Sequence, residues 1–163
     1  MQDIVAIQQI EREYYEGFSC PQDILKFWIA SLSDNFLVAE EKNCVIAFLF
    51  FEYLNKVKAI PFVHKLEHRS NGKYVYVSEV GVSDEYLETS ALQTLFDNMK
   101  RKATSDNCKG IVWLTGSKSK HDKIEKGILA DNLFKKQKRV EDWEAYPGYC
   151  VSDHFIWYKD IRG

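Results

Sequence analysis

The chain has 163 residues and a mass of 19.1 kDa, which suits a single domain, residues 1–163, with a full hydrophobic core. Hydrophobic residues make up 45% and charged residues 28%, a balance that excludes an intrinsically disordered chain. The formal net charge is -2, so no overall positive field attracts nucleic acid or anionic lipid, and we expect no nucleic-acid partner.

The longest apolar stretch, residues 44–51, is too short to cross a bilayer, and the N-terminus has no basic segment followed by an apolar run. We therefore expect a cytoplasmic protein without a membrane partner. The four cysteines lie far apart and form no CxxC pair, so we expect free, mostly buried thiols and no zinc site or disulfide scaffold. They are Cys20, Cys44, Cys108 and Cys150.

The first part of the chain predicts two helices in a hairpin. Apolar residues recur at steps of three and four, typical of an amphipathic helix that ends near Glu16. Gly17 ends this helix, and residues 19–22 resemble a capping box with an early proline before a second helix. The inward positions are Ile4, Ile7, Ile10 and Tyr14 in the first helix and Ile24, Leu25, Trp28 and Leu32 in the second.

Two strands are predicted next, over residues 36–39 and 44–53. The short polar turn at residues 41–43 suits an antiparallel hairpin between them. Residues 55–73 contain Pro61, two histidines and a Ser-Asn-Gly sequence, so this segment is predicted to be a long loop.

The second half predicts a strand over residues 74–82, a helix that ends near Ala103 and a short strand over residues 111–114. This order favours a right-handed crossover between two parallel strands. A short helix near Ile128 and two strands, over residues 137–145 and 150–159, complete the pattern. We therefore predict an α+β fold in which helices flank a mixed sheet of about six strands with a central βαβ unit.

The order of these elements and several local phrases resemble the GNAT superfamily, N-acyltransferases that use acetyl-CoA, and in particular the N-terminal protein acetyltransferases. Residues 3–51 resemble the opening helices and the second and third strands of that fold. SEVGVSDEY, residues 78–86, resembles the fourth strand, and residues 127–161 resemble the last helix and final two strands. Since the chain starts within the first helix, the resemblance implies a GNAT-like sheet without its first edge strand.

The resemblance implies acetyl-CoA or CoA as a co-substrate and no metal. The family's CoA-binding signature, Gln or Arg followed by xxGxG or xxGxA, would begin at Leu87, but Ser90 and Leu92 stand where its glycines usually are. Glu88 adds a negative charge near the expected phosphates. The donors to the pyrophosphate are backbone N–H groups at a helix N-terminus, so the altered loop keeps them. The expected loop residues are Leu87, Glu88, Thr89, Ser90, Ala91 and Leu92.

The resemblance further implies that backbone groups of Val80, Gly81 and Val82 bind the pantetheine amides in sheet fashion, the alternative being an ordinary core strand. Asp122 lies near the position of the family's asparagine after the fifth strand. The lysines around it either attract the CoA phosphates or are simply solvated. They are Lys118, Lys120, Lys123 and Lys126.

Glu79 is the candidate general base, because many family members place an acidic residue on the fourth strand and an attacking amine must lose a proton. A glutamate that faces solvent or pairs with a lysine is the alternative. The family's usual general acid is a tyrosine, but the matching residue here is Leu129, which cannot donate a proton. A CoA thiolate can leave without an acid, so the enzyme hypothesis survives this change.

Two further features bear on a binding site. His64 and His68 are four residues apart, but Pro61 and polar neighbours favour a loop over a metal-binding helix, and that loop could border an acceptor pocket. Aromatic residues, at 14%, are expected mostly in the core. If some line the acceptor site, Phe18, Tyr53 or Phe62 should be partly exposed in a cleft.

We therefore predict an N-acyltransferase that transfers an acetyl or other acyl group from acyl-CoA to an amine of a small molecule or peptide. One alternative is a catalytically inactive GNAT-like binding or regulatory module. Another is a likeness of architecture alone, with a ligand other than CoA. An open sheet edge would also suit a homodimer.

Overall fold

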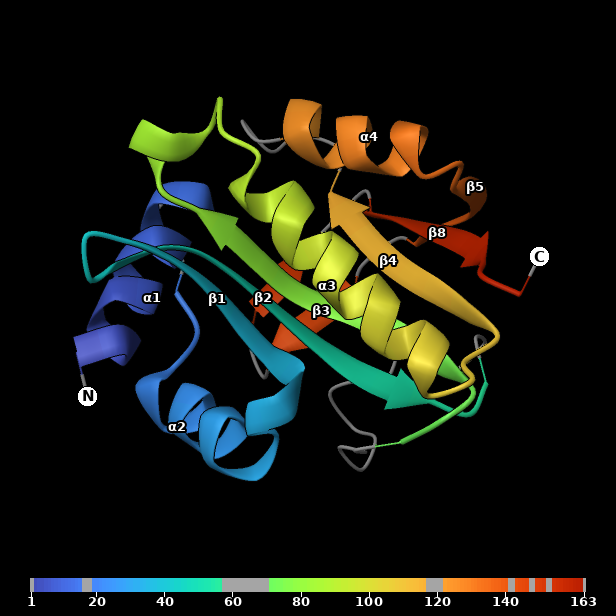
Figure 1. The fold of residues 1–163 in the computed structure, drawn as a ribbon, viewed down its shortest axis with the longest axis horizontal. Helices are drawn as coiled ribbons and strands as arrows, with labels where there is room; N and C mark the ends of the chain where they lie inside the picture. Colours follow the sequence, from blue (N-terminus) through green and yellow to red (C-terminus); the bar gives the residue numbers. More distant parts are fainter. Residues whose placement is uncertain are drawn as a thin grey trace. The chain divides into compact units, whose positions relative to one another are not determined.

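The computed structural model describes residues 2–15, 19–56, 71–116, 122–140, 143–146, 149–151 and 154–162 (Figure 1). The elements in chain order are α1 (Gln2–Tyr14), α2 (Gln22–Ser31), the 3-10 turn η1 (Ser33–Asn35), β1 (Phe36–Glu41), β2 (Cys44–Leu54), β3 (Tyr74–Val82), the 3-10 turn η3 (Asp84–Tyr86), α3 (Ala91–Ser105), β4 (Gly110–Gly116), α4 (Asp122–Asp131), β5 (Lys135–Val140), β6 (Trp143–Tyr146), β7 (Tyr149–Val151) and β8 (His154–Asp160).

Six strands form a mixed sheet in the order β1-β2-β3-β4-β8-β5, and β6 and β7 form a separate two-stranded sheet. β3 and β4 are parallel and joined through α3, whereas β1 with β2, β4 with β8 and β5 with β8 are antiparallel. The predicted α+β class, the six-stranded mixed sheet and the central βαβ unit are therefore confirmed. No helix among the described residues is long and apolar enough to cross a membrane.

The chain divides into two compact units, one of Met1–Phe51 with Ser78–Arg101 and the other of Glu52–Val77 with Lys102–Gly163. The single domain expected over residues 1–163 stays a prediction.

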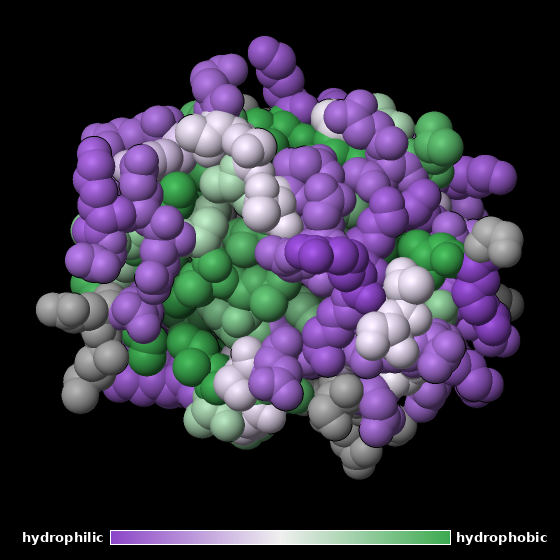
Figure 2. All heavy atoms as spheres, in the orientation of Figure 1, coloured by the Kyte–Doolittle hydropathy of each residue, from purple (hydrophilic) through white to green (hydrophobic). Residues whose placement is uncertain are grey.

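Figure 2 shows one face of the molecule, on which hydrophilic residues predominate and apolar side chains gather over β1 and β2. The prevalence of polar residues on this face agrees with a chain in which 28% of the residues are charged.

The first unit is built on aromatic packing between α2 and the β1–β2 hairpin, which lie beside each other in Figure 1. Trp28 stacks on Phe50 with ring centroids 4.6 Å apart, and Phe36 stacks on Phe48 and Phe50 at 5.8 and 5.5 Å. Each such pair stabilises a fold by about 0.5–1.5 kcal/mol beyond the area that it buries. These stacks fix α2 against the hairpin.

The turn between β1 and β2 is the predicted hairpin turn. Lys42 and Asn43 have φ angles of 50° and 64°, and the flanking residues Glu41 and Cys44 pair directly. Two consecutive residues with positive φ make the tight turn whose twist matches that of antiparallel strands.

The predicted capping box before α2 is wrong, because Pro21 is the N-cap residue and no side chain caps the helix.

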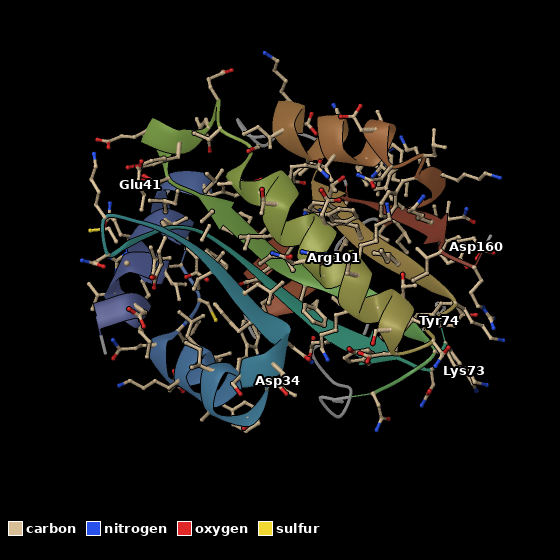
Figure 3. All side chains as sticks on the ribbon, in the orientation of Figure 1. Asp34, Glu41, Lys73, Tyr74, Arg101 and Asp160 are labelled. Atoms are coloured by element: carbon tan, nitrogen blue, oxygen red, sulfur yellow. The ribbon has the colours of Figure 1, made fainter. Side chains whose placement is uncertain are left out.

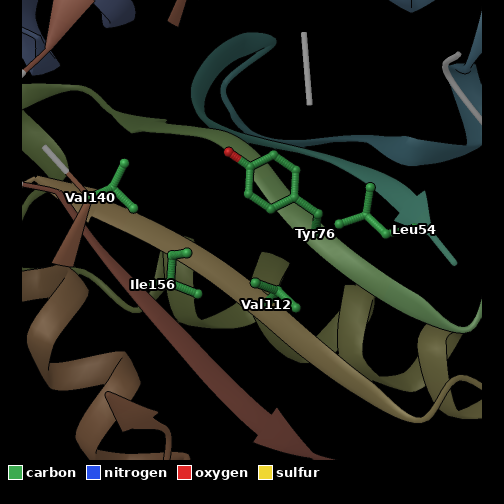
Figure 4. Packing of buried hydrophobic residues seen from close by; sticks show 5 residues of the cluster. All are labelled: Leu54, Tyr76, Val112, Val140 and Ile156. Carbon is green, nitrogen blue, oxygen red and sulfur yellow. The ribbon is translucent and has the colours of Figure 1, made fainter. Parts of the chain in front are cut away.

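The second unit contains the pairing of β3, β4, β8 and β5. Its apolar cluster consists of Leu54, Tyr76, Val112, Val140 and Ile156, which come from five strands (Figure 4). At the edge of this cluster, the indole N–H of Trp157 donates to the Thr115 hydroxyl at 3.0 Å. The cluster holds strands that are far apart in the sequence.

The two closing strands expected over residues 137–145 and 150–159 are in fact four. The first expected strand is divided because β5 pairs with β8 whereas β6 pairs with β7. Of the three aromatic residues expected to border the acceptor site, Tyr53 is 1% exposed and its hydroxyl bonds Asp106, so the expectation now rests on Phe18 and Phe62 and stays a prediction. Phe18, Phe62, His64, His68, Lys118 and Lys120 lie outside the described residues.

The expectation of free, mostly buried thiols is confirmed where cysteine side chains are described. Cys20 and Cys108 are buried free thiols, and Cys44 is an exposed one. The side chain of Cys150 lies outside the described residues.

Candidate functional site

The candidate site lies in the first unit, on the second half of β3. The parallel register between β3 and β4 ends with the pair Val77 and Trp113, and β3 continues to Val82. Glu79 is 9% exposed, and Val80 and Val82 are 1% and 2% exposed. The carboxyl group of Glu79 is thus buried in an apolar strand, and the alternative of a solvent-facing glutamate does not describe it.

Gly81 allows a close approach between this strand and its neighbours. A Cβ atom at this position would lie 2.5 Å from the Phe48 ring and 2.8 Å from Cγ2 of Ile10. No ordinary side chain tolerates such distances, so glycine lets α1 and β2 pack directly on this part of β3. This packing brings α1 close to Glu79.

A second buried carboxyl group, that of Glu11 on α1, belongs to the same site. Glu11 is 1% exposed, and its Oε2 accepts a hydrogen bond of 2.9 Å from the backbone N–H of Cys20. Side-chain donor atoms of Glu11, Cys20 and Glu79 all lie within 4.8 Å of one another. Two carboxyl groups and a thiol from three separate segments therefore meet in the interior of this unit.

The two carboxyl groups influence each other strongly. Burial, followed by the nearby charge of Glu79 and a hydrogen bond with Glu79, raises the pKa of Glu11 from 4.5 to about 10. The Cys20 N–H and the charge of Arg12 act in the opposite sense but do not outweigh burial. The raised pKa favours the protonated form of Glu11.

The sequence prediction missed Glu11, although the sequence contains a signal for it. Glu11 follows Ile7 by four residues and precedes Tyr14 by three, so it lies on the apolar face of the helix that these residues define. A carboxylate on such a face must be buried with a partner or with a proton. This rule could have marked Glu11 as a site residue.

The same three residues offer the oxygen and sulfur donors that zinc binds in proteins. A structural zinc site usually has four ligands, whereas three donor groups meet here among the described residues, and Oε2 of Glu11 already accepts the Cys20 N–H. The arrangement fits a hydrogen-bonded carboxyl pair better than a metal centre. The expected absence of a metal stays a prediction.

Tyr15, just after α1, contacts the backbone that was expected to bind pantetheine. Its hydroxyl donates to the Val80 carbonyl at 2.8 Å and accepts from the Val80 N–H at 3.4 Å. The backbone groups of Val80 are thus engaged by a side chain rather than free. One residue before Val80, along the same strand, is the buried Glu79.

The end of α1 is fastened to the end of β3 by a second set of bonds. Oε2 of Glu13 accepts from the Ser83 hydroxyl at 3.2 Å and from the Asp84 N–H at 3.3 Å. The Ser83 N–H in turn donates to the Ile46 carbonyl on β2 at 2.9 Å. These bonds hold the end of β3 between α1 and β2.

The turn before α3 holds the predicted phosphate loop. Leu87, Glu88, Thr89, Ser90 and Ala91 occupy this turn and the first residue of the helix. The Thr89 hydroxyl donates to the Tyr86 carbonyl at 2.7 Å and accepts from the Ala91 N–H at 3.3 Å, so it caps the helix.

Leu92 does not crowd this loop. Its side chain is 2% exposed and points into the core, whereas Glu88 and Ser90 are exposed. The side chain of Leu92 therefore leaves the solvent side of the helix N-terminus open. The negative charge of Glu88 is the remaining feature that disfavours a phosphate there.

Tyr86 anchors the other side of this turn. Its hydroxyl forms a hydrogen bond with Glu41 at the end of β1, and this bond, followed by desolvation, raises the pKa of Tyr86. Figure 3 labels Glu41 at the end of the strand. The loop is thus held at Thr89 and at Tyr86.

Two expected site positions belong to the second unit. Asp122 begins α4 and pairs with Lys126, and its Oδ1 is buried with no hydrogen-bond partner among the described residues. Leu129 is 2% exposed in the same helix, so the position of the expected general acid is part of an apolar core. Of the other lysines near Asp122, Lys123 is exposed.

Comparison with solved structures identifies the fold. The chain is similar to GphF, a GNAT-like decarboxylase solved with isobutyryl-CoA, with a TM-score of 0.78, 10% identity, and coverage of 98% of this chain and 95% of that one. It is similar to the loading GNATL domain of CurA from Lyngbya majuscula, with a TM-score of 0.77, 14% identity and coverage of 98% and 92%.

An Ard1 protein from Thermoplasma volcanium gives a TM-score of 0.75 at 10% identity, with coverage of 99% of this chain and 93% of that one. No protein-family model matches the sequence, and no curated protein matches it. At identities of 10–14% these similarities show the fold alone, and that fold is the GNAT fold that the sequence resemblance predicted.

Proposed function

We propose that this protein is an acyl-CoA-dependent N-acyltransferase, which transfers an acetyl or related acyl group to an amine. Its co-substrate is acetyl-CoA or another acyl-CoA, and its acceptor is an amine of a small molecule or a peptide. The GNAT fold and the solution of a similar protein with isobutyryl-CoA support the acyl-CoA part of the proposal. Cytoplasmic location, a single domain and a homodimer stay predictions.

One observation carries the proposal. The N–H and C=O groups of Val80 lie next to a buried carboxyl group and are satisfied by a hydroxyl, which a ligand can displace. The pantetheine arm of CoA carries secondary amides, which offer the same pair of hydrogen-bonding groups as a neighbouring strand. An arm that replaced the Tyr15 hydroxyl at Val80 would bring its thioester close to Glu79.

In the proposed reaction Glu79 is the general base. The neutral amine attacks the thioester carbonyl carbon, a C–N bond forms and the C–S bond breaks. The proton lost from the amine nitrogen passes to the Glu79 carboxylate, directly or through a water molecule, and CoA leaves as the thiolate. Leu129 supplies no proton, so the leaving thiolate takes its proton from solvent.

The exposed turn before α3 is the proposed site for the CoA phosphates. The first N–H groups of an α-helix have no partner within the helix, and its dipole favours a negative charge. Thr89 already satisfies the Ala91 N–H, which leaves the donors of Leu92 and Gln93 in the first turn for this role. Without the usual glycines and with Glu88 nearby, we expect a weaker phosphate contact than an unmodified loop gives.

A catalytically inactive GNAT-like module is the second candidate. The observations that favour it are the Tyr15 hydroxyl at Val80 and the buried Leu129 at the position of the general acid. This candidate predicts that no acyl-CoA is turned over, whether or not a small molecule binds.

Calorimetric titration with acetyl-CoA and with free CoA, at low and moderate salt, tests the proposal. Saturable binding with one site per chain, followed by acetylation of members of an amine panel, is the expected result. Binding of CoA without turnover would favour the inactive module. No binding at millimolar acetyl-CoA would overturn the acyltransferase proposal.

A further inference from the structure

The buried carboxyl group of Glu11 has no part in the reaction as described so far, although it is among the most buried polar groups of the chain. We propose that Glu11 and Glu79 act as one acid–base unit, in which Glu11 retains a proton and positions the Glu79 carboxylate. This inference deepens the proposed function and rests on it for the role of Glu79 as the base.

The two carboxyl groups are buried close together. Glu11 is 1% exposed and Glu79 is 9% exposed, and their carboxyl groups lie within 4.8 Å of each other. Two carboxylates at this separation in an apolar interior cannot both stay charged, because each charge loses its hydration and repels the other. One proton shared between them leaves a single negative charge and a hydrogen bond.

The hydrogen bonds indicate which oxygen of Glu11 carries the proton. Oε1 is buried and has no hydrogen-bond partner among the described residues, so the hydrogen bond between the two carboxyl groups involves Oε2. Oε2 also accepts the Cys20 N–H at 2.9 Å, and an oxygen that carries a proton keeps a lone pair for this bond. The raised pKa of Glu11, caused by burial and by Glu79, agrees with this assignment.

The groups that act on the pair come from three segments. Arg12 on α1 favours the charged form of Glu11, and Glu79 on β3 opposes it. The Cys20 thiol, from the segment before α2, is the third titratable group of the cluster and is itself buried. The cluster thus contains two acids and a thiol, and the charge of Arg12 does not outweigh the effect of burial on the pKa of Glu11.

The chemical consequence is a division of roles. The proton of Glu11 stays in place through the reaction, and its hydrogen bond holds the Glu79 carboxylate in one orientation. Glu79 alone exchanges protons, taking one from the attacking amine and releasing it to solvent after the product leaves. The pair therefore alternates between one proton and two.

Carboxyl NMR of protein labelled with ¹³C in glutamate side chains tests the pair without any substrate. In the wild type, one resonance should titrate near pH 10, the pKa of Glu11. Glu11→Gln should remove it, and Glu79→Gln should move it to lower pH because the neighbouring charge is gone. Glu125→Gln, which replaces another buried glutamate, is the matched control and should leave it unchanged.

The positioning role is tested by kinetics of two Glu11 variants. Glu11→Gln keeps a hydrogen-bond donor and should retain kcat within roughly threefold, whereas Glu11→Leu lacks a donor and should lose roughly tenfold or more in kcat with little change in KM. Equal losses in both variants would mean that Glu11 only supports the fold, and this would overturn the positioning role.

Different results would overturn the Glu11–Glu79 pair and the proposed acyltransferase function. A Glu11 resonance that titrates near its ordinary value of 4.5, or that ignores Glu79→Gln, would overturn the pair. Titration behaviour that changes after dialysis against EDTA would identify a bound cation and would also overturn it. A confirmed pair in a protein that transfers no acyl group would leave the pair standing and remove the proposed function.

Discussion

In α1 and β3, the acidic groups that the proposed reaction needs are present and buried, whereas in α4 the position of the usual acid is an apolar side chain. Glu11 and Glu79 are 1% and 9% exposed and keep their carboxyl groups close together. Leu129 is 2% exposed, and its hydrocarbon side chain has no proton to donate. The difference teaches that buried acidic groups gather in α1 and β3, whereas this position of α4 contributes to an apolar core.

The largest expected effect comes from the base. Replacing the carboxylate by an amide in Glu79→Gln removes the proton acceptor and should lower kcat by roughly 10²–10⁴-fold, the usual contribution of general acid–base catalysis. Steady-state kinetics with acetyl-CoA and an accepted amine measure this loss. Glu125→Gln, in the second unit, should retain wild-type kcat, and wild-type kcat in Glu79→Gln would remove Glu79 from the mechanism.

The second largest expected effect is a fall in the free energy of unfolding as the pH rises, caused by Glu11. The pKa of Glu11 is about 10 in the folded chain against an ordinary value of 4.5, so the folded state binds a proton that the unfolded state releases between these values. The stability from Glu11 is complete below pH 4.5 and is lost as the pH rises toward 10.

This loss has a measurable slope. The free energy of unfolding should fall by up to about 1.4 kcal/mol per pH unit in this window. Urea unfolding between about pH 6 and about pH 9 measures the slope, and Glu11→Gln should flatten it. Equal slopes in both proteins would show that Glu11 is not protonated in the folded chain.

A third experiment asks whether α4 can regain an acid. Because Leu129 is buried in a packed core, Leu129→Tyr should destabilise the chain by about 1–3 kcal/mol through overpacking and should not raise kcat. The control is Leu133→Tyr at a position that is 78% exposed, where we expect little change in urea unfolding. A stable and more active Leu129→Tyr protein would mean that this position still faces an active site.

The smallest effect concerns the Tyr15 hydroxyl. Tyr15→Phe removes the group that competes for the N–H and C=O of Val80, so acetyl-CoA should bind more tightly. One net hydrogen bond of about 1 kcal/mol corresponds to roughly fivefold in Kd. Tyr53→Phe, whose hydroxyl bonds Asp106 instead, should leave Kd unchanged. A weaker complex in Tyr15→Phe would mean that Tyr15 holds the ligand.

The sequence predicts what local patterns determine. The expected strand over residues 74–82 has the bounds of β3, and the short polar sequence at residues 41–43 forms the expected turn between β1 and β2. Local patterns do not predict long-range contacts. Glu11 and Glu79 are 68 positions apart, and the bond between Tyr15 and Val80 spans 65, so no local pattern pairs them.

The division of the closing strands was missed for a similar reason. Residues 137–145 contain no Gly or Pro to signal a turn, and β5 and β6 differ in the strand with which each pairs. For the site, the sequence singled out Glu79 but not the carboxyl group that shares its environment. Glu11 was detectable as an acid on an apolar helix face, but its partner was not.

The central claim is that acyl-CoA binds along β3 beside the carboxyl pair. Titration of ¹⁵N-labelled protein with acetyl-CoA, followed by NMR of the backbone amides, tests it most directly. We predict saturable shifts that are largest for the N–H groups of Val80, Gly81 and Val82 and for those of the first turn of α3. Saturating acetyl-CoA that leaves the Val80 amide unshifted would contradict the account.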